Sequence, residues 1–330
     1  MAPHSPRPGG PEPLAVPRQD AEPEGVPGRA DPVISVVIPH LAQPELLRRC
    51  LRSLAAQEGA PPFEVLVVDN GSAELPAEIC AAFGARLLAE PVPGPGPARN
   101  RGADAARGAI LAFTDADCVI DPGWLAAIAR RFGQDPQVGI LGGDVRIALA
   151  DPDRITAVEA YESIYAFRTR LYIERDRYVA TLNMAVRRTV FEQVGPFGGI
   201  EIAEDIDWGQ RATALGLPMV YEPAARVQHP ARPDFAALCR KWDRHLAHFY
   251  DEARRRPLWW PRWIAKAGAV ALSPVGETLT VLRSKRIEGG RARWLAFEGL
   301  TRIRLYRAGR MLSLGLGADP ARLSGAWNRG

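Results

Sequence analysis

An apolar run that ends in two aspartates constrains the fold of this chain most strongly. Residues 108–113, Gly-Ala-Ile-Leu-Ala-Phe, lead through Thr114 into Asp115-Ala116-Asp117. Such a run is typical of a strand buried on both faces of a sheet. Residues two apart in an extended segment point the same way, so we expect both carboxylates to face one site at the strand end. The pair would then need a cation or hydrogen-bond donors between its charges, but a plain acidic turn also remains open.

Strand-like and helix-like patterns alternate over the first two thirds of the chain. Further strands are expected at residues 33–39, 63–69, 85–89, 138–149, 178–187 and 218–227. Helices are expected at residues 46–57, 76–83, 98–107, 123–132, 155–175, 190–194 and 204–215, with loops at 94–97 and 195–199. This β-α-β-α order predicts an α/β fold with a doubly wound sheet, whose ligands bind outside the C-terminal strand ends.

Composition allows one large domain with an appendage, or two domains. The chain has 330 residues, of which 47% are hydrophobic, and four widely spaced cysteines that form no CxxC pair. We therefore expect buried, reduced thiols in a cytoplasmic protein rather than disulfides or a zinc site. Residues 1–31 are rich in Pro and Gly, which predicts a disordered tail. No apolar signal-peptide segment is found there.

The charge is unevenly distributed, which indicates a separate task for the C-terminal region. Residues 254–330 carry a net charge of +12, whereas residues 1–253 carry −8. We expect a helix over residues 235–255, an interrupted apolar stretch over 258–282 and a basic helix over 291–316. Lys266, Pro274 and Glu277 make the apolar stretch a poor membrane span. Tryptophans beside arginines suit a membrane interface instead, but a helical cap packed on the main domain remains open.

Five features stand in a fixed order along the chain. They are a strand ending at Pro39, a strand ending in Asp69-Asn70-Gly71-Ser72, the segment 96–102, the Asp115/Asp117 pair and Glu204-Asp205. This set resembles the family 2 glycosyltransferases of the GT-A fold, although Asp-x-Asp alone occurs widely. The resemblance implies three parts, namely the tail over residues 1–31, a GT-A domain over 32–232 and a basic helical C-terminal region over 233–330.

A nucleoside-diphosphate sugar, such as a UDP- or GDP-sugar, is the donor that the resemblance implies. Asp69 would accept a hydrogen bond from the nucleotide base, because a carboxylate is an acceptor. Arg99 would lie near the base or phosphates, and Asn100 would help to position the nucleotide at a helix start that favours anions. The further implied donor contacts are Pro39, Asp115 and Ala116. A turn residue for Asp69 and a plain helix start for Arg99 remain open.

A divalent cation, Mg²⁺ or Mn²⁺, is the implied cofactor. By the resemblance, Asp117 binds the cation, and Asp115 contacts the ribose or the water shell of the metal. Carboxylate, water and diphosphate oxygens suit these metals. The cation would stabilise the negative charge that develops on the departing diphosphate. His229 follows the last strand, where some relatives place a metal-binding histidine, although a structural role remains open.

Asp205 is the general base in family terms. It would remove the proton from the acceptor hydroxyl as that oxygen attacks the anomeric carbon opposite the diphosphate, which inverts the centre. Glu204 would raise the pKa of this base or orient it. An acidic first turn of a helix, favoured by the helix dipole, is the alternative interpretation.

The acceptor residues implied by the resemblance are Asn183, Asp207, Trp208 and Arg211. Trp208 would form a platform for an acceptor sugar or pack in the core, and Arg211 would pair with Asp207 one helical turn away. The expected acceptor is a glycan, a lipid-linked molecule or a small molecule, as in cell-envelope or exopolysaccharide biosynthesis. No nucleic-acid partner is expected. The protein would be cytoplasmic, peripheral on the membrane if its basic C-terminal region binds there.

Two departures from the family pattern bear on these expectations. Pro39 is followed by His40-Leu41 rather than by an aromatic residue and Asn, and the Gln-x-x-Arg-Trp signature of processive enzymes is missing, so we expect limited sugar transfer. A sugar nucleotidyltransferase is disfavoured because no Gly-rich phosphate loop follows the first strand. An inactive membrane-associated scaffold is also disfavoured, because a decayed site would not keep Asp115, Asp117 and Asp205.

Overall fold

One mixed sheet of eight strands organises the part of the chain that the computed structural model describes, residues 31–200 and 202–320. The predicted disorder of residues 1–31 therefore falls almost wholly outside the described residues. The strand order is β3-β2-β1-β4-β7-β6-β8-β5. The strands are β1 (Ile34–His40), β2 (Phe63–Asp69), β3 (Arg86–Ala89), β4 (Ile110–Thr114), β5 (Val119–Ile120), β6 (Ile140–Ala148), β7 (Asn183–Arg187) and β8 (Met219–Pro230).

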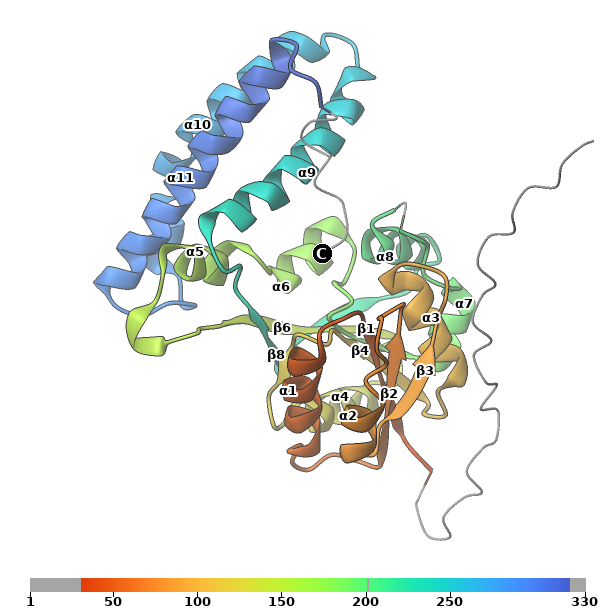
Figure 1. Cartoon of the computed structure of the whole chain (residues 1–330). Coiled ribbons are helices and arrows are strands. Elements are labelled where there is room, and N and C mark those ends of the chain that lie inside the picture. Colours follow the sequence, from red (N-terminus) through yellow and green to blue (C-terminus); the bar gives the residue numbers. More distant parts are fainter. Residues whose placement is uncertain (1–30, 201, 321–330) are drawn as a thin grey trace, which may run out of the picture.

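Helices cover both faces of this sheet, as Figure 1 shows. On one face lie α1 (Pro44–Ala55), α2 (Ala77–Ala82) and α4 (Trp124–Gln134), and on the other lie α3 (Pro95–Ala105), α7 (Arg188–Val194) and α8 (Glu204–Ala214). The connection after β6 contains a 3₁₀ turn, η1 (Pro152–Arg154), α5 (Ala157–Tyr165), α6 (Thr169–Leu171) and a π-helical turn, η2 (Tyr172–Asp176).

The strand directions bring several C-terminal strand ends to one edge of the sheet. β1 pairs in parallel with β2 and β4, and β6 pairs in parallel with β8. β7 is antiparallel to both β4 and β6, so β6 runs in the same direction as β4. We call the side where β1, β2, β4, β6 and β8 end the C-terminal edge. In sheets of this kind, ligands bind at such an edge near a reversal of strand order.

A separate helical layer follows the sheet. It consists of α9 (Phe235–Arg254), α10 (Trp259–Arg283) and α11 (Gly290–Gly315), which extend away from the sheet (Figure 1). Buried side chains of α9 and α11 pack against Tyr161 and Ile164 of α5. Gly299 of α11 permits this approach, because a Cβ there would lie 2.5 Å from the Ala157 carbonyl oxygen.

The predicted fold class is therefore confirmed: a doubly wound, mixed α/β sheet with a C-terminal helical extension. Three element predictions are wrong in detail. α3 begins at Pro95 rather than at Ala98, since proline fits the first helical position and Gly94 has φ 121°. The stretch expected to be interrupted is one helix, α10, with Pro274 inside it. β7 begins only at Asn183.

The helix predicted over residues 155–175 is also broken. Arg168 has non-helical torsions (φ −120°, ψ 55°) between α5 and α6. Next to it, the ring of Phe167 packs 5.0 Å from the imidazole of His229. The break therefore brings an aromatic side chain against the end of β8.

All four cysteines are free, and three of them are buried, whereas Cys239 is partly exposed. No helix in the described residues is long and apolar enough to cross a membrane. The predicted domain boundaries at residues 32 and 232 stay predictions.

Candidate active site

The candidate active site lies at the C-terminal edge, where β1 and β4 are neighbours and their following loops diverge. The loop after β4 carries Asp115 and Asp117, and β2 ends in Asp69. α8 begins with Glu204 and Asp205. The sheet topology and long-range ion pairs therefore bring the predicted acidic residues to a common region.

Arg99 of α3 connects the two acidic motifs. Its guanidinium donates to Asp115 Oδ1 at 2.6 Å and to Glu204 Oε1 at 2.8 Å, although Glu204 lies 105 residues further along the chain. Arg99 is only 3% exposed, so it is strongly desolvated and needs both partners. The predicted contact of this side chain with a nucleotide is replaced here by a bridge between carboxylates.

Asp115 and Asp117 do not lie on an extended strand, contrary to the prediction. β4 ends at Thr114, and the Asp115 carbonyl accepts a bond from Cys118 N–H, so the aspartates lie in a tight turn. Asp115 binds Arg99, whereas Asp117 faces His229; Ala116 between them is buried. The turn sends the two carboxylates to different partners.

Asp117 and His229 form the most suitable pair for a cation. Asp117 Oδ2 lies 3.3 Å from His229 Nε2, and His229 Nδ1 lies 2.7 Å from the Pro230 carbonyl oxygen. A proton on Nδ1 would satisfy that carbonyl and leave the Nε2 lone pair directed at the carboxylate. Burial, together with the charge of Asp115, raises the pKa of Asp117 despite the opposing effect of His229.

The spacing of this pair fits two adjacent ligands of an octahedral cation. Metal–ligand bonds of about 2.1 Å at a right angle place the two ligand atoms about 3.0 Å apart. In the described residues, no three His, Cys, Asp or Glu side chains gather as a complete metal site. A cation held here would thus need further oxygen ligands from a bound molecule or water.

Asp205 lies in the first turn of α8, where its Oδ1 accepts a bond from Ile206 N–H at 2.8 Å. Burial, with a further contribution from the neighbouring Glu204 charge, raises its pKa to about 6. Burial is the main cause that raises the pKa of Tyr172 and of Tyr178, and the charge of Asp205 raises both further. Those two half-buried rings stack 4.9 Å apart, and sequence analysis had assigned them no role.

Asp69 is not free to receive a nucleotide base in this structure. It is 2% exposed, and its oxygens accept bonds from the Gly71 and Ser72 amides, the Ser72 hydroxyl and His40 Nδ1. Burial alone would raise the pKa of Asp69, but the hydrogen bonds from Ser72 and His40 lower it. His40, which follows Pro39 where the family pattern has an aromatic residue, thus has a structural role, because its imidazole holds the Asp69 carboxylate.

Several predicted ligand contacts instead fasten the loop at residues 195–199. Asn100 both donates to the Phe197 carbonyl and accepts from its amide, and the Trp208 indole donates to the Gly195 carbonyl. Arg211 binds the carbonyls of Val194 and Pro196 and pairs with Asp207 at 3.0 Å, a pairing that the sequence predicted. These side chains hold the loop that precedes α8.

Two of the predicted acceptor residues are buried in this structure. Trp208 is 1% exposed and packs among Phe191 and Phe197, the core position that was the alternative to a sugar platform. Asn183 is also 1% exposed, and its amide joins the Trp124 indole to the carbonyls of Asp144 and Ala225. Both residues therefore hold neighbouring backbone segments in place.

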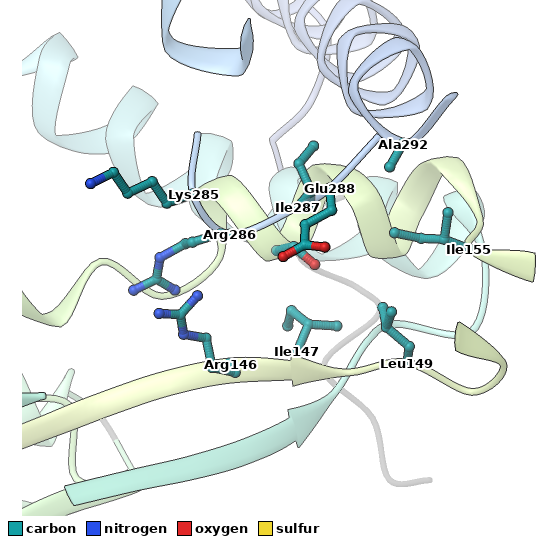
Figure 2. A pocket seen from close by; sticks show the side chains of 10 residues that line it. Arg146, Ile147, Leu149, Ile155, Lys285, Arg286, Ile287, Glu288 and Ala292 are labelled. Atoms are coloured by element: carbon teal, nitrogen blue, oxygen red, sulfur yellow. The ribbon is translucent and has the colours of Figure 1, made fainter. Parts of the chain in front are cut away.

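A cavity of about 400 Å³ opens further along the same edge. Figure 2 shows the cationic side chains of Arg146, Lys285 and Arg286 toward one end and aliphatic side chains toward the other. Ile147 in its wall is the strand partner of His229. Arg146 and Arg286 both bind the buried Asp144 carboxylate, at 2.5 Å and 2.8 Å, so much of the positive charge is already neutralised.

Comparison with known proteins identifies the class. A family model described as glycosyl transferase family 2 matches residues 35–195. Over 219 residues the chain is 34% identical to Glycosyltransferase AglE of Haloferax volcanii, an alignment that covers 64% of this chain and 70% of that protein. The chain therefore belongs to the family 2 glycosyltransferases.

The chain is also similar to a second curated enzyme and to a solved structure. The chain is 30% identical over 229 residues to Validoxylamine A glucosyltransferase of Streptomyces hygroscopicus subsp. limoneus, covering 57% of this chain and 49% of that enzyme. Among solved structures, mannosyltransferase PcManGT from Pyrobaculum calidifontis, in complex with GDP-Man and Mn²⁺, aligns with a TM-score of 0.49 and 18% identity. That alignment covers 90% of this chain and 79% of the other.

Proposed function

We propose that this glycosyltransferase moves a sugar from a nucleoside-diphosphate sugar to an acceptor hydroxyl with inversion, and that Asp205 is its general base. The observation that carries this assignment is the carboxylate of Asp205, whose pKa is raised to about 6 beside Glu204. A base works best when its pKa lies near the working pH. Arg99 pairs both with Glu204, next to the proposed base, and with Asp115, so a single buried side chain connects the proposed acceptor side and donor side of the site.

Proton transfer follows from this arrangement. Asp205, ionised above pH 6, accepts the proton of the acceptor hydroxyl as the oxygen attacks the anomeric carbon. Glu204 is held beside the base by Arg99, and its charge adds to burial in raising the pKa of Asp205, which favours transfer of the hydroxyl proton to Asp205. Arg99 is a positioning residue in this scheme, because its buried guanidinium is occupied by two carboxylates.

Asp117 and His229 are the residues that we propose to hold Mg²⁺ or Mn²⁺. Their ligand atoms lie 3.3 Å apart and include the imidazole nitrogen and carboxylate oxygen that such ions accept. When bound, the cation supplies electrostatic stabilisation of the departing diphosphate. Asp115 stays with Arg99, which fits a contact with the ribose or with metal-bound water better than direct coordination.

Tyr172 and Tyr178 take the place of Trp208 as the proposed acceptor platform. They are stacked and half-buried, and the charge of Asp205 contributes to the raised pKa of each hydroxyl. Aromatic rings of this kind offer an apolar face and a hydroxyl for polar contacts. A sugar or other acceptor that lies on them would have its hydroxyl near the base.

We also propose that α10 attaches the enzyme to an anionic membrane surface. Leu272, Val275, Leu279 and Leu282 are spaced along one face of this helix and are 73%, 76%, 58% and 54% exposed. Arg262 and Lys266 near the helix start and Arg283 at its end are also exposed. An apolar stripe flanked by cations suits a helix that lies in the headgroup region.

Metal-dependent nucleotide binding tests the proposed site. Asp117→Asn should remove most of the rise in melting temperature that Mn²⁺ with UDP or GDP produces in the wild type, because bound ligand stabilises the folded state. Asp104→Asn, an exposed change on α3, is the matched control and should keep the full rise. An Asp117→Asn variant that retains the wild-type response to both nucleotides would refute the metal assignment.

A further inference from the structure

Cationic side chains gather between α9 and α11 without matching negative charge. Lys241 and Arg244 lie on α9 and Arg307 on α11, and we call these three residues the α9 cation cluster; His245, also on α9, lies beside them. The two helices meet here, because the rings of Trp242 and His245 on α9 lie 5.6 Å apart and the Arg307 guanidinium of α11 lies 3.5 Å from the centre of the Trp242 ring. Arg307 is only 8% exposed, and Lys241 and Arg244 are half-buried.

Within residues 31–200 and 202–320, Lys241, Arg244 and Arg307 form no ion pair with a carboxylate. The carboxylates in the surrounding helices are already used: Arg232 binds Glu162, Arg304 pairs with Glu277 at 3.7 Å and Arg310 binds Asp243. The guanidinium of Arg307 lies 3.5 Å from the centre of the Trp242 ring, and its Nε has no hydrogen-bond partner. A buried donor left without an acceptor is costly.

Burial and the repulsion between neighbouring cations therefore both disfavour positive charge at this position. Burial, reinforced by Arg232 and Arg244, lowers the pKa of Lys241 to about 8. Burial, reinforced by Lys241 and Arg244, lowers the pKa of His245 to about 4. An anion in this region would reverse these effects by pairing with the cations.

The cluster is also close in the chain to the proposed metal residues. β8 ends at Pro230, directly after His229, and Arg232 then binds Glu162 of α5 before α9 begins at Phe235. Figure 1 shows α9 leading from the end of β8 into the helical layer above the sheet. Lys241 lies in the second turn of α9, close to this connection. A ligand held by the cluster would approach the C-terminal edge from the α9 side.

We propose that the α9 cation cluster binds a phosphate group carried by the acceptor. This inference rests on the proposed glycosyltransferase function and specifies its acceptor as a phosphorylated molecule. Guanidinium groups pair with phosphate oxygens through two parallel hydrogen bonds, and a lysine adds a point charge. The cavity beside Asp144 is the weaker candidate, since that carboxylate already binds two of the arginines in its wall.

Calorimetric titration of the full chain tests the site, with geranyl phosphate and glycerol 3-phosphate as probes and no metal or nucleotide present. The double variant Lys241→Gln/Arg244→Gln should bind the probe at least tenfold more weakly than the wild type. The matched control Arg254→Gln/Arg255→Gln removes two cations from the other end of the same helical region and should change binding less than twofold. The test variant should melt no lower than the wild type, since it loses repelling charges.

The two probes distinguish the sources of the phosphate. Tighter binding of geranyl phosphate would indicate that the natural phosphate is carried by a lipid. Equal binding of both probes would indicate that the site recognises the phosphate group alone. Either result supports the site. Wild-type affinity in the double variant, or no binding of either probe, would overturn it. Binding of Mn²⁺ with UDP and GDP is measured on the same samples, so normal nucleotide binding with no probe binding would refute this inference alone.

Discussion

Arg99 shows at the residue scale how one buried cation can organise a site. It joins Asp115, 16 residues away, to Glu204, 105 residues away, and both carboxylates lie beside residues with proposed chemical roles. Loss of the guanidinium would leave two acidic groups facing each other in a poorly solvated region. Burial is the main cause of the raised pKa of Asp205, and in this neighbourhood Glu204 raises it further whereas Arg99 lowers it.

The pH dependence of stability should report the environment of Asp205. Its pKa rises from 3.8 to about 6 on folding, so the native state binds more protons than the unfolded state between about pH 4 and 6. The stabilisation linked to this proton is complete below pH 4 and is lost as the pH rises through 6. Asp205→Asn should therefore be more stable than the wild type at pH 7 by roughly 1 kcal/mol, after allowance for solvent screening.

Urea unfolding of both proteins from pH 4 to 7.5 measures this effect. The stability difference should grow across the window for Asp205→Asn and stay constant for the surface control Asp104→Asn. A difference that does not vary with pH would show that Asp205 has an ordinary pKa.

At the scale of elements, the loop at residues 195–199 contacts α3 and leads toward α8. Asn100 and Arg211 both donate hydrogen bonds to its backbone carbonyls, and Gly96 lets α3 approach it closely. A Cβ at Gly96 would lie 2.0 Å from the Gly198 carbonyl oxygen, a contact that no rotamer change can relieve. The position of α8, and with it Asp205, depends on this contact.

Gly96→Ala should consequently destabilise the protein by about 1–3 kcal/mol, the usual range for an overpacked contact. It should also reduce sugar transfer, because the loop would move away from α3. Gly309→Ala is the matched control: beyond the adjacent backbone of its own helix, no described atom lies within 4 Å of its added Cβ, and helix propensity should stabilise α11 by up to about 1 kcal/mol. Equal urea midpoints for Gly96→Ala and the wild type would contradict the proposed packing.

Sequence reasoning located the elements well but misjudged individual side chains for identifiable reasons. The apolar runs predicted the strands of the sheet except the two-residue β5, since burial on both faces leaves a strong pattern only in longer strands. No pattern along the chain tells whether a polar residue points to solvent or into a buried network, and Asn183 and Trp208 belong to such networks. Likewise, Tyr178 lies 27 residues from Asp205 by number, and only the fold brings their charges together.

At the scale of the whole molecule, the helical layer carries two different surfaces. The face of α10 that includes Leu272 and Val275 is apolar and exposed, whereas the α9 cation cluster is polar and partly enclosed. The first suits a lipid surface and the second a soluble or lipid-borne phosphate. Both lie outside residues 35–195 that match the family model, so membership of the family does not determine them.

Membrane attachment should depend on the α10 face. Leu272→Gln/Val275→Gln should reduce binding to vesicles that contain phosphatidylglycerol by about thirtyfold, because each of the two aliphatic side chains contributes on the order of 1 kcal/mol when it is partly buried in lipid. Leu75→Gln/Leu215→Gln changes two exposed leucines, 53% and 49% exposed, outside the helical layer and should have little effect. Vesicle sedimentation that is equal for all three proteins would argue against attachment through α10.

The role of Asp205 as the base is tested most directly by separating donor binding from transfer. Asp205→Asn should bind Mn²⁺ with the preferred nucleotide as the wild type does, while sugar transfer to the acceptor falls by at least about a hundredfold, the usual contribution of a general base. In the wild type, transfer should increase as the pH rises through about 6, where Asp205 loses its proton. Transfer at the wild-type rate by Asp205→Asn would contradict the account.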